Sequence, residues 1–164
     1  MQLSSILTSI ALLASLALPA AWPAQALSGA PVENLADQAI LEMSQAFKQG
    51  NVKRLSALLP QVRGHVLEPW GAYWELRARL ELASPREIEE FLTRYAGTYQ
   101  EDRLRNDWLA LLGQRQEWGS FMAEYPNFRM NDDRSVRCYA LMTEFNSGRL
   151  DVAFEVQALW LAQR

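Results

Sequence analysis

The chain has one cysteine and one histidine among its 164 residues. A single cysteine excludes an internal disulfide, and a single histidine without cysteine or carboxylate at ligand spacing argues against a metal site. His65 lies in a loop between two prolines, where we expect an exposed or capping residue. For Cys138 we expect a small, buried apolar side chain.

The sequence also has no large excess of positively or negatively charged residues. Sixteen lysines and arginines are interleaved with nineteen aspartates and glutamates, for a formal net charge of −3. This balance argues against nucleic acid as a partner and against a polybasic membrane patch. Glu87, Glu89 and Glu90 fall in the first turn of an expected helix. Interaction with the helix dipole and solvation account for negative charge at such positions.

The chain lacks a glycine-rich phosphate loop, a nucleophile elbow and a cysteine–histidine arrangement. These are the motifs by which a cofactor site or a nucleophilic active site is recognised in sequence. We therefore predict no catalytic, cofactor-binding or metal-binding residue in this chain.

The segment 1–26 contains no charged side chain and runs apolar from Ile6 to Ala21 before Ala24-Gln25-Ala26. Such a segment predicts an export signal that is cleaved after Ala26, although its basic n-region is missing. A membrane anchor is the alternative, but a spanning helix needs about 20 apolar residues. Polar residues and prolines interrupt this run at Thr8, Ser9, Ser15, Pro19 and Pro23.

Removal of the signal would leave residues 27–164 as one domain without a membrane span. Export combined with a single cysteine fits a bacterial periplasm, that of a Gram-negative cell, better than a small secreted scaffold.

Apolar residues in this region follow helical and not strand spacing. Three stripes carry the pattern: Ala36, Ile40, Met43 and Phe47; Ile88, Phe91, Leu92 and Tyr95; Leu104, Trp108, Leu111 and Leu112. We predict an all-α chain of about eight helices. The least regular connections are expected at residues 60–69 and 125–132.

Helix ends are marked by local signals. Ser84-Pro85-Arg86-Glu87 combines an N-cap serine, a proline and a capping-box glutamate, which predicts a helix beginning at Pro85. Gly50, Gly97 and Gly148 suit the left-handed C-cap position. Asp132 or Asp133 can cap the helix that contains residues 136–145.

An apolar residue precedes each of four successive turns: Phe47, Leu80, Leu112 and Phe145. Their spacing is nearly constant at roughly 33 residues, which is typical of stacked helix pairs. The fold that we expect is a right-handed superhelix of such pairs, similar to a tetratricopeptide-type solenoid, which usually serves as a scaffold or binding surface.

Trp70, Tyr73 and Trp74 occupy one helical face. Aromatic residues at this spacing usually fill the seam between repeat helices, and the same reasoning applies to Trp108, Trp118 and Trp160. The alternative is that Trp70, Tyr73 and Trp74 form a face that contacts glycan.

Several runs together resemble the N-terminal helical region of soluble lytic murein transglycosylases. In order they are residues 67–77 (LEPWGAYWELR), 91–95 (FLTRY), 117–121 (EWGSF) with Tyr125-Pro126, 137–140 (RCYA), 145–149 (FNSGR) and 158–161 (ALWL). The resemblance covers residues 36–160, almost all of the expected mature chain.

The resemblance implies a U-shaped domain of helix pairs, followed in that family by a lysozyme-like catalytic domain. Those enzymes cleave the bond between N-acetylmuramic acid and N-acetylglucosamine in peptidoglycan. One glutamate acts as acid and then base, while the sugar's own hydroxyl attacks and gives an anhydro product. The catalytic glutamate of that family lies in a Glu-Ser pair, which occurs nowhere in these 164 residues.

Two functions are therefore expected. The first is the non-catalytic N-terminal scaffold of a periplasmic lytic transglycosylase in cell-wall turnover, with glycan strands bound by a catalytic domain that this chain lacks and with cell-wall synthesis proteins as further partners. The apolar periodicity of residues 150–164 favours it, because solenoids normally end in a polar capping repeat. The second is a stand-alone periplasmic helical-repeat adaptor that binds another protein.

Overall fold

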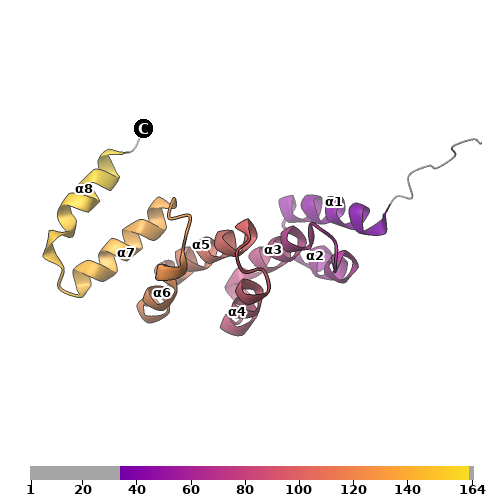
Figure 1. The fold of residues 1–164 in the computed structure, drawn as a ribbon, viewed down its shortest axis with the longest axis horizontal. Helices are drawn as coiled ribbons and strands as arrows, with labels where there is room; N and C mark the ends of the chain where they lie inside the picture. The colour runs from indigo at the N-terminus through magenta and orange to yellow at the C-terminus, as the bar shows by residue number, and fades with distance from the viewer. Residues whose placement is uncertain (1–33, 163–164) are drawn as a thin grey trace, which may run out of the picture. The chain divides into compact units, whose positions relative to one another are not determined.

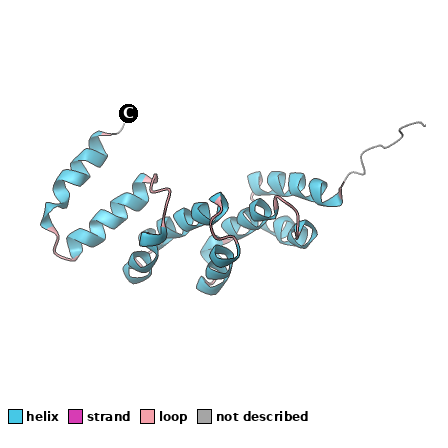
Figure 2. Cartoon of the chain, in the orientation of Figure 1, coloured by secondary structure: helices cyan, strands magenta, loops and turns pink. Residues whose placement is uncertain are grey.

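A computed structural model describes residues 34–162, so the predicted export signal and its cleavage site lie outside the described residues. Within this range the chain is all-helical, without a strand (Figure 2). The eight α-helices of this range follow one another in chain order from α1 to α8 (Figure 1). They are α1 (Leu35–Lys48), α2 (Val52–Leu58), α3 (Glu68–Ala78), α4 (Pro85–Arg94), α5 (Tyr99–Gln114), α6 (Trp118–Glu124), α7 (Arg134–Asn146) and α8 (Ala153–Leu161). The predicted all-α class and helix number are confirmed for residues 34–162.

The described helices form four consecutive pairs. The second helices of the first three pairs begin at Val52, Pro85 and Trp118, in agreement with the period that the sequence predicts. The first helices contact one another in chain order, with α1 on α3, α3 on α5 and α5 on α7. The second helices α2, α6 and α8 pack against the first helix of their own pair, whereas α4 packs against α5, the first helix of the next pair. Apolar faces are thus buried between neighbouring pairs along the chain.

Local signals located the helix ends well. Ser84 accepts the backbone N–H of Glu87 while the Glu87 carboxylate accepts that of Ser84, so the predicted capping box is present. Asp133 caps α7 by accepting the N–H groups of Ser135 and Val136. Gly97 has a φ of +84°, a left-handed conformation that glycine adopts without strain.

The expected irregular connections contain short 3₁₀ helices. Leu59–Val62 and Tyr125–Asn127 form such turns, each around a proline. Helix α3 begins at Glu68, one residue before Pro69, because proline is tolerated in the first helical turn. The segment expected as one helix from residue 150 begins as a 3₁₀ turn, Leu150–Val152, before α8.

The core of the described residues has three clusters. In the N-terminal cluster, Met43, Leu55 and Val62 are fully buried between α1, α2 and the turn that follows. The larger central cluster lies between α3 and α7 and includes Leu104 and Phe121. Trp74 packs against both of these and joins them into one apolar interior. The third, small cluster lies between α7 and α8 and consists of Leu141, Val152 and Leu159.

The contact between α5 and α7 depends on a glycine. A Cβ atom added to Gly113 would lie 2.2 Å from Cδ2 of the Tyr139 ring. The rigid ring could not move aside within its packed surroundings, since it also lies against Trp118 and Phe121. The absence of a side chain at position 113 therefore lets α7 approach α5.

We predict that Gly113→Ala lowers the free energy of unfolding by about 1–3 kcal/mol, because the added methyl group overpacks this contact. The measurement is urea unfolding followed by far-UV circular dichroism. Gly119→Ala is the matched control, since a Cβ atom at this position in α6 meets nothing within 4 Å. It should be neutral or stabilising by up to about 1 kcal/mol, as alanine is the better helix former. Equal effects of the two substitutions would contradict the proposed role of Gly113.

Candidate functional site

The predicted aromatic face divides into buried and accessible parts. Tyr73 is only 7% exposed, and its hydroxyl donates to Asp107 Oδ2 at 2.8 Å. Burial, followed by the charge of Asp107, raises the pKa of Tyr73 to about 12. Trp74 is half-buried, with its ring centroid 6.3 Å from that of Phe47. Tyr73 and Trp74 therefore fill the seam between repeat helices.

Trp70 joins these residues to a tyrosine that the sequence did not single out. The Trp70 centroid lies 5.8 Å from that of Trp74 on one side and 5.8 Å from that of Tyr99 on the other. Trp70 is half-buried, and Tyr99 is 53% exposed. The rings of Phe47, Trp74, Trp70 and Tyr99 thus form a series across α1, α3 and α5, which we call the aromatic stripe.

Charged side chains border the aromatic stripe. Asp107 accepts Nε of Arg77 at 3.0 Å in addition to the Tyr73 hydroxyl. Arg103 lies near Tyr73, Asp107 and Tyr99, whose polar groups and charges act on its guanidinium. Burial alone would lower the pKa of Arg103, but these partners raise it above its usual value. The guanidinium beside the stripe is therefore a permanent cation.

A buried carboxylate orients the start of α3. Glu68, 9% exposed, accepts the backbone N–H of Gly64 at 2.7 Å, a guanidinium N–H of Arg94 at 2.6 Å and the hydroxyl of Tyr95 at 2.8 Å. Burial would raise the pKa of Glu68, yet the bonds from Gly64, Tyr95 and Arg94 together hold it below its ordinary value. This carboxylate fixes the turn from which Trp70 projects, two residues later.

The same arrangement recurs one repeat later, at the start of α5. Glu101 accepts the N–H of Gly97 at 3.0 Å and a guanidinium N–H of Arg129 at 2.7 Å, and it pairs with Arg105. We call these two sites, Glu68 with Gly64 and Arg94, and Glu101 with Gly97 and Arg129, the carboxylate latches. The second latch holds the first turn of α5, which begins at Tyr99. The two latches therefore position the two accessible rings of the aromatic stripe.

Asp102, beside the second latch, holds the loop before α7. It is 2% exposed and accepts the backbone N–H groups of Arg129 at 3.0 Å and Met130 at 2.7 Å. Arg105 supplies its counter-charge and also bonds Glu124 of α6 at 2.6 Å. The buried carboxylate thereby has hydrogen-bond partners of its own and fixes two backbone donors of this loop.

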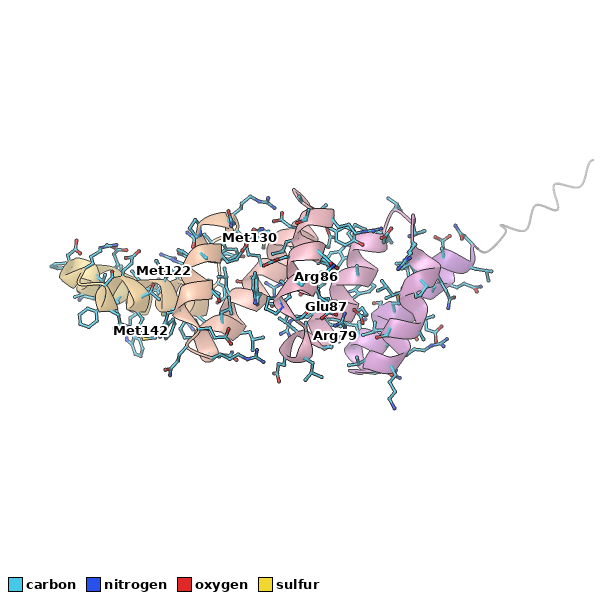
Figure 3. The ribbon with its side chains drawn as sticks, turned by 90° about the horizontal axis from the view of Figure 1, so that it is seen from below. Arg79, Arg86, Glu87, Met122, Met130 and Met142 are labelled. Atoms are coloured by element: carbon cyan, nitrogen blue, oxygen red, sulfur yellow. The ribbon has the colours of Figure 1, made fainter. Side chains whose placement is uncertain are left out.

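A second candidate site is a groove of about 750 Å³ between α3 and α4. Its charged residues include Arg79, Arg86 and Glu87 (Figure 3). Arg79 pairs with Glu87 at 2.6 Å and with the buried Glu75 at 2.8 Å. The backbone N–H of Ser84, then Arg79, then the Ser84 hydroxyl lower the pKa of Glu87 to about 2. A carboxylate held ionised in this way caps a helix and is a poor proton donor near neutral pH.

His65 is a capping residue, one of the two alternatives that the sequence predicts. Its side chain is only 12% exposed, and Nε2 lies 2.7 Å from Oδ1 of Asp37. Nδ1 accepts the N–H of Leu67. The partner Asp37 lies far earlier in the chain, in α1, and no sequence spacing indicates that pairing. Within residues 34–162 no group of three or more histidine, cysteine, aspartate or glutamate residues could hold a metal ion.

Predictions at the C-terminal pair need correction. The sequence predicts a buried Cys138, but its side chain is exposed. The sequence also predicts that Trp160 locks one pair on the next, but this side chain is 70% exposed. Trp108 is buried and Trp118 packs against Phe121 and Tyr139, as predicted. The reason for the difference is that no further helix within the described residues covers this face of α7 and α8.

This uncovered face forms an apolar groove of about 760 Å³ between α7 and α8. Its exposed lining includes Phe145, Val156 and Met142, and Figure 3 labels Met142. On α8, Phe154 and Leu161 are 79% and 70% exposed. A helix with apolar side chains on most of its faces is normally covered by other protein.

Comparisons with known proteins find no significant match for the chain among family models, curated proteins or solved structures. Among residues 34–162, no helix has the length and apolar character that a membrane crossing requires. The described part of the chain is thus an all-α array of four helix pairs with an aromatic stripe, a charged groove and an apolar groove.

Glu68→Gln should lower stability at pH 7 by about 1–3 kcal/mol, since it removes a charge on which three donors converge. It should also weaken the pH dependence. A carboxyl with a depressed folded-state pKa contributes stability above its unfolded pKa and loses that contribution as pH falls through the folded pKa. Urea unfolding at pH 7 and pH 3 should therefore show a smaller difference for the variant than for the wild type. Glu89→Gln, an exposed position on α4, is the control and should keep the wild-type difference.

We further predict that the chain self-associates through α8, and that the double substitution Phe154→Gln with Trp160→Gln shifts it toward monomer. The physical reason is the burial of exposed apolar area, about 25 cal/mol for each Å² removed from water. Sedimentation velocity measures the shift. Leu82→Gln is the control, as this leucine is 87% exposed but lies in the turn between α3 and α4, away from this face. A wild-type chain that sediments as one monomeric species would contradict the prediction.

Proposed function

We propose that this chain is a non-catalytic helical-repeat scaffold, the N-terminal part of a periplasmic lytic transglycosylase that cleaves peptidoglycan strands. The observation that carries the proposal is the stacking of helix pairs at a nearly constant interval, with α1, α3, α5 and α7 in contact in chain order. Such an array continued over more pairs would generate the right-handed superhelix that the sequence resemblance implies.

In this proposal the chemistry belongs to a separate lysozyme-like domain. The chain has no Glu-Ser pair. Its buried carboxylates Glu68, Glu75, Glu101 and Asp102 are each bonded to an arginine. A general acid must exchange its proton near neutral pH, and a carboxylate committed to a guanidinium is unsuited to that task. The described residues therefore serve structure and positioning.

The apolar groove between α7 and α8 fits the same proposal. In the earlier pairs the first helix contacts the first helix of the next pair, as α5 contacts α7. A following helix pair would lie against α7 in the same manner and would reduce the exposure of the apolar side chains on α7 and α8.

A stand-alone periplasmic adaptor is the second candidate, and the same groove favours it, because an exposed apolar surface rimmed by polar residues often marks a protein-binding site. In that case the occupant would be a helix of another protein, bound saturably. Substitution of Phe145 and Trp160, which line the groove, would then abolish capture of that partner.

Two measurements decide the proposal. One is sequencing of the gene on the 3′ side of the Arg164 codon, and the other is an activity assay. We expect further helix pairs and a lysozyme-like domain that contains a Glu-Ser pair. We also expect the purified chain, Met1 to Arg164, to release no anhydro-muropeptides from isolated sacculi, while the product of the entire reading frame releases them. A reading frame without a lysozyme-like domain, or release by the purified chain itself, would overturn the proposal.

A further inference from the structure

The helices α3 and α5 each have two opposite faces with different roles. On α3, Ala72, Glu75, Leu76 and Arg79 line the groove shared with α4. Trp70 and Arg77, two helical turns apart, lie on the opposite side of the helix, since about 3.6 residues make a turn. On α5, Arg105 reaches α6, and Tyr99 with Arg103 lies on the side away from it. Trp70, Arg77, Tyr99 and Arg103 therefore share the surface of the α3–α5 layer that faces away from the second helices.

The accessible rings on this surface come from two different repeats. Trp70 and Tyr99 have centroids 5.8 Å apart, with planes inclined by 40°. Tyr99 belongs to none of the three core clusters and is 53% exposed. Burial in the core therefore does not account for its ring, whereas the contact with Trp70 creates an aromatic surface larger than either side chain provides alone.

Hydrogen-bonding groups stand directly beside these rings. Arg77 is 45% exposed even though it pairs with Asp107. Arg103 lies near the Tyr73 hydroxyl, and a guanidinium has five N–H donors, so donors remain for a ligand. Asp107 pairs with Arg77 and bonds Tyr73, which keeps both of these partners in place.

We propose that Trp70, Tyr99 and Arg103 form a binding site for a linear saccharide that carries N-acetyl or carboxylate groups. The apolar face of a pyranose presents C–H groups, whose partial positive charge is attracted to the negative face of an aromatic ring. Arg103 donates to the carbonyl or carboxylate oxygen of the same sugar. This inference rests on the proposed cell-wall function and adds to it a contact between the scaffold and the glycan.

Other ligand classes fit this surface less well. Nucleic acid would stack on the same rings, but it also requires a row of cations along its backbone. Among the described residues, the cations beside the rings are Arg77 and Arg103; Asp107 neutralises one of them, and the chain carries a net charge of −3. A saccharide needs ring stacking and a few directed donors, which this surface provides.

The test is titration of the full chain with chitotetraose, the β-linked tetramer of N-acetylglucosamine, followed by tryptophan fluorescence and by NMR chemical shifts. We expect saturable binding that Trp70→Ala and Tyr99→Ala each weaken roughly tenfold. Tyr99→Phe should retain binding, because it keeps the stacking surface. Arg103→Gln should weaken binding without removing the rings.

Trp160→Ala is the matched control, since it removes an exposed tryptophan of α8 that lies outside the proposed site. It should leave chitotetraose binding unchanged. Tyr99→Ala should leave the fold intact, because truncation of an exposed side chain outside the core costs little stability. Loss of binding in this variant would therefore reflect the site and not unfolding. Absence of saturable binding by the wild type, or equal losses in Trp160→Ala and Tyr99→Ala, would overturn the inference. Neither result tests the scaffold proposal, which is tested by the coding sequence beyond the Arg164 codon. The glycan-binding inference and the scaffold proposal can therefore fail separately.

Discussion

A buried carboxylate at the start of a helix, held by the preceding turn and by an arginine from a later element, is the interaction on which this array of helices depends. Glu68 and Glu101 repeat it in consecutive helix pairs. A charge removed from water is tolerated only when its hydrogen-bonding capacity is satisfied, so each latch permits little variation in geometry. The packing of apolar side chains supplies most of the stability, but these charges fix the start of α3 and of α5 relative to the turn before it and to the arginine that follows later in the chain.

The aromatic stripe follows from that constraint. Trp70 lies two residues after one latch glutamate and Tyr99 two residues before the other. The rings can meet because both helix starts are fixed relative to the turns behind them, and Asp107 fixes Tyr73 and Arg77 beside them. A site built from consecutive helical repeats in this way inherits its rigidity from the scaffold and needs no loop of its own.

Local features of the fold were predictable from sequence, whereas long-range ones were not. The capping box at Ser84, the left-handed Gly97 and the cap at Asp133 depend on residues within one turn of each other. The pairing of His65 with Asp37 and the contact of Tyr99 with Trp70 join residues of different helix pairs or distant turns, which only tertiary packing brings together. The predictions for Cys138 and Trp160 are wrong for a related reason, because burial there requires a neighbouring helix, and none among the described residues covers that face.

The exposed thiol has a practical consequence for the apolar groove. Cys138 is the only cysteine of the chain and lines the groove between α7 and α8. A thiol-reactive fluorophore would therefore label a single position without any engineered substitution. Its emission and its rate of attachment would report, in real time, whether the groove is open to solvent or shielded by whatever occupies it. The molecule thus carries its own reporter of access to the apolar groove.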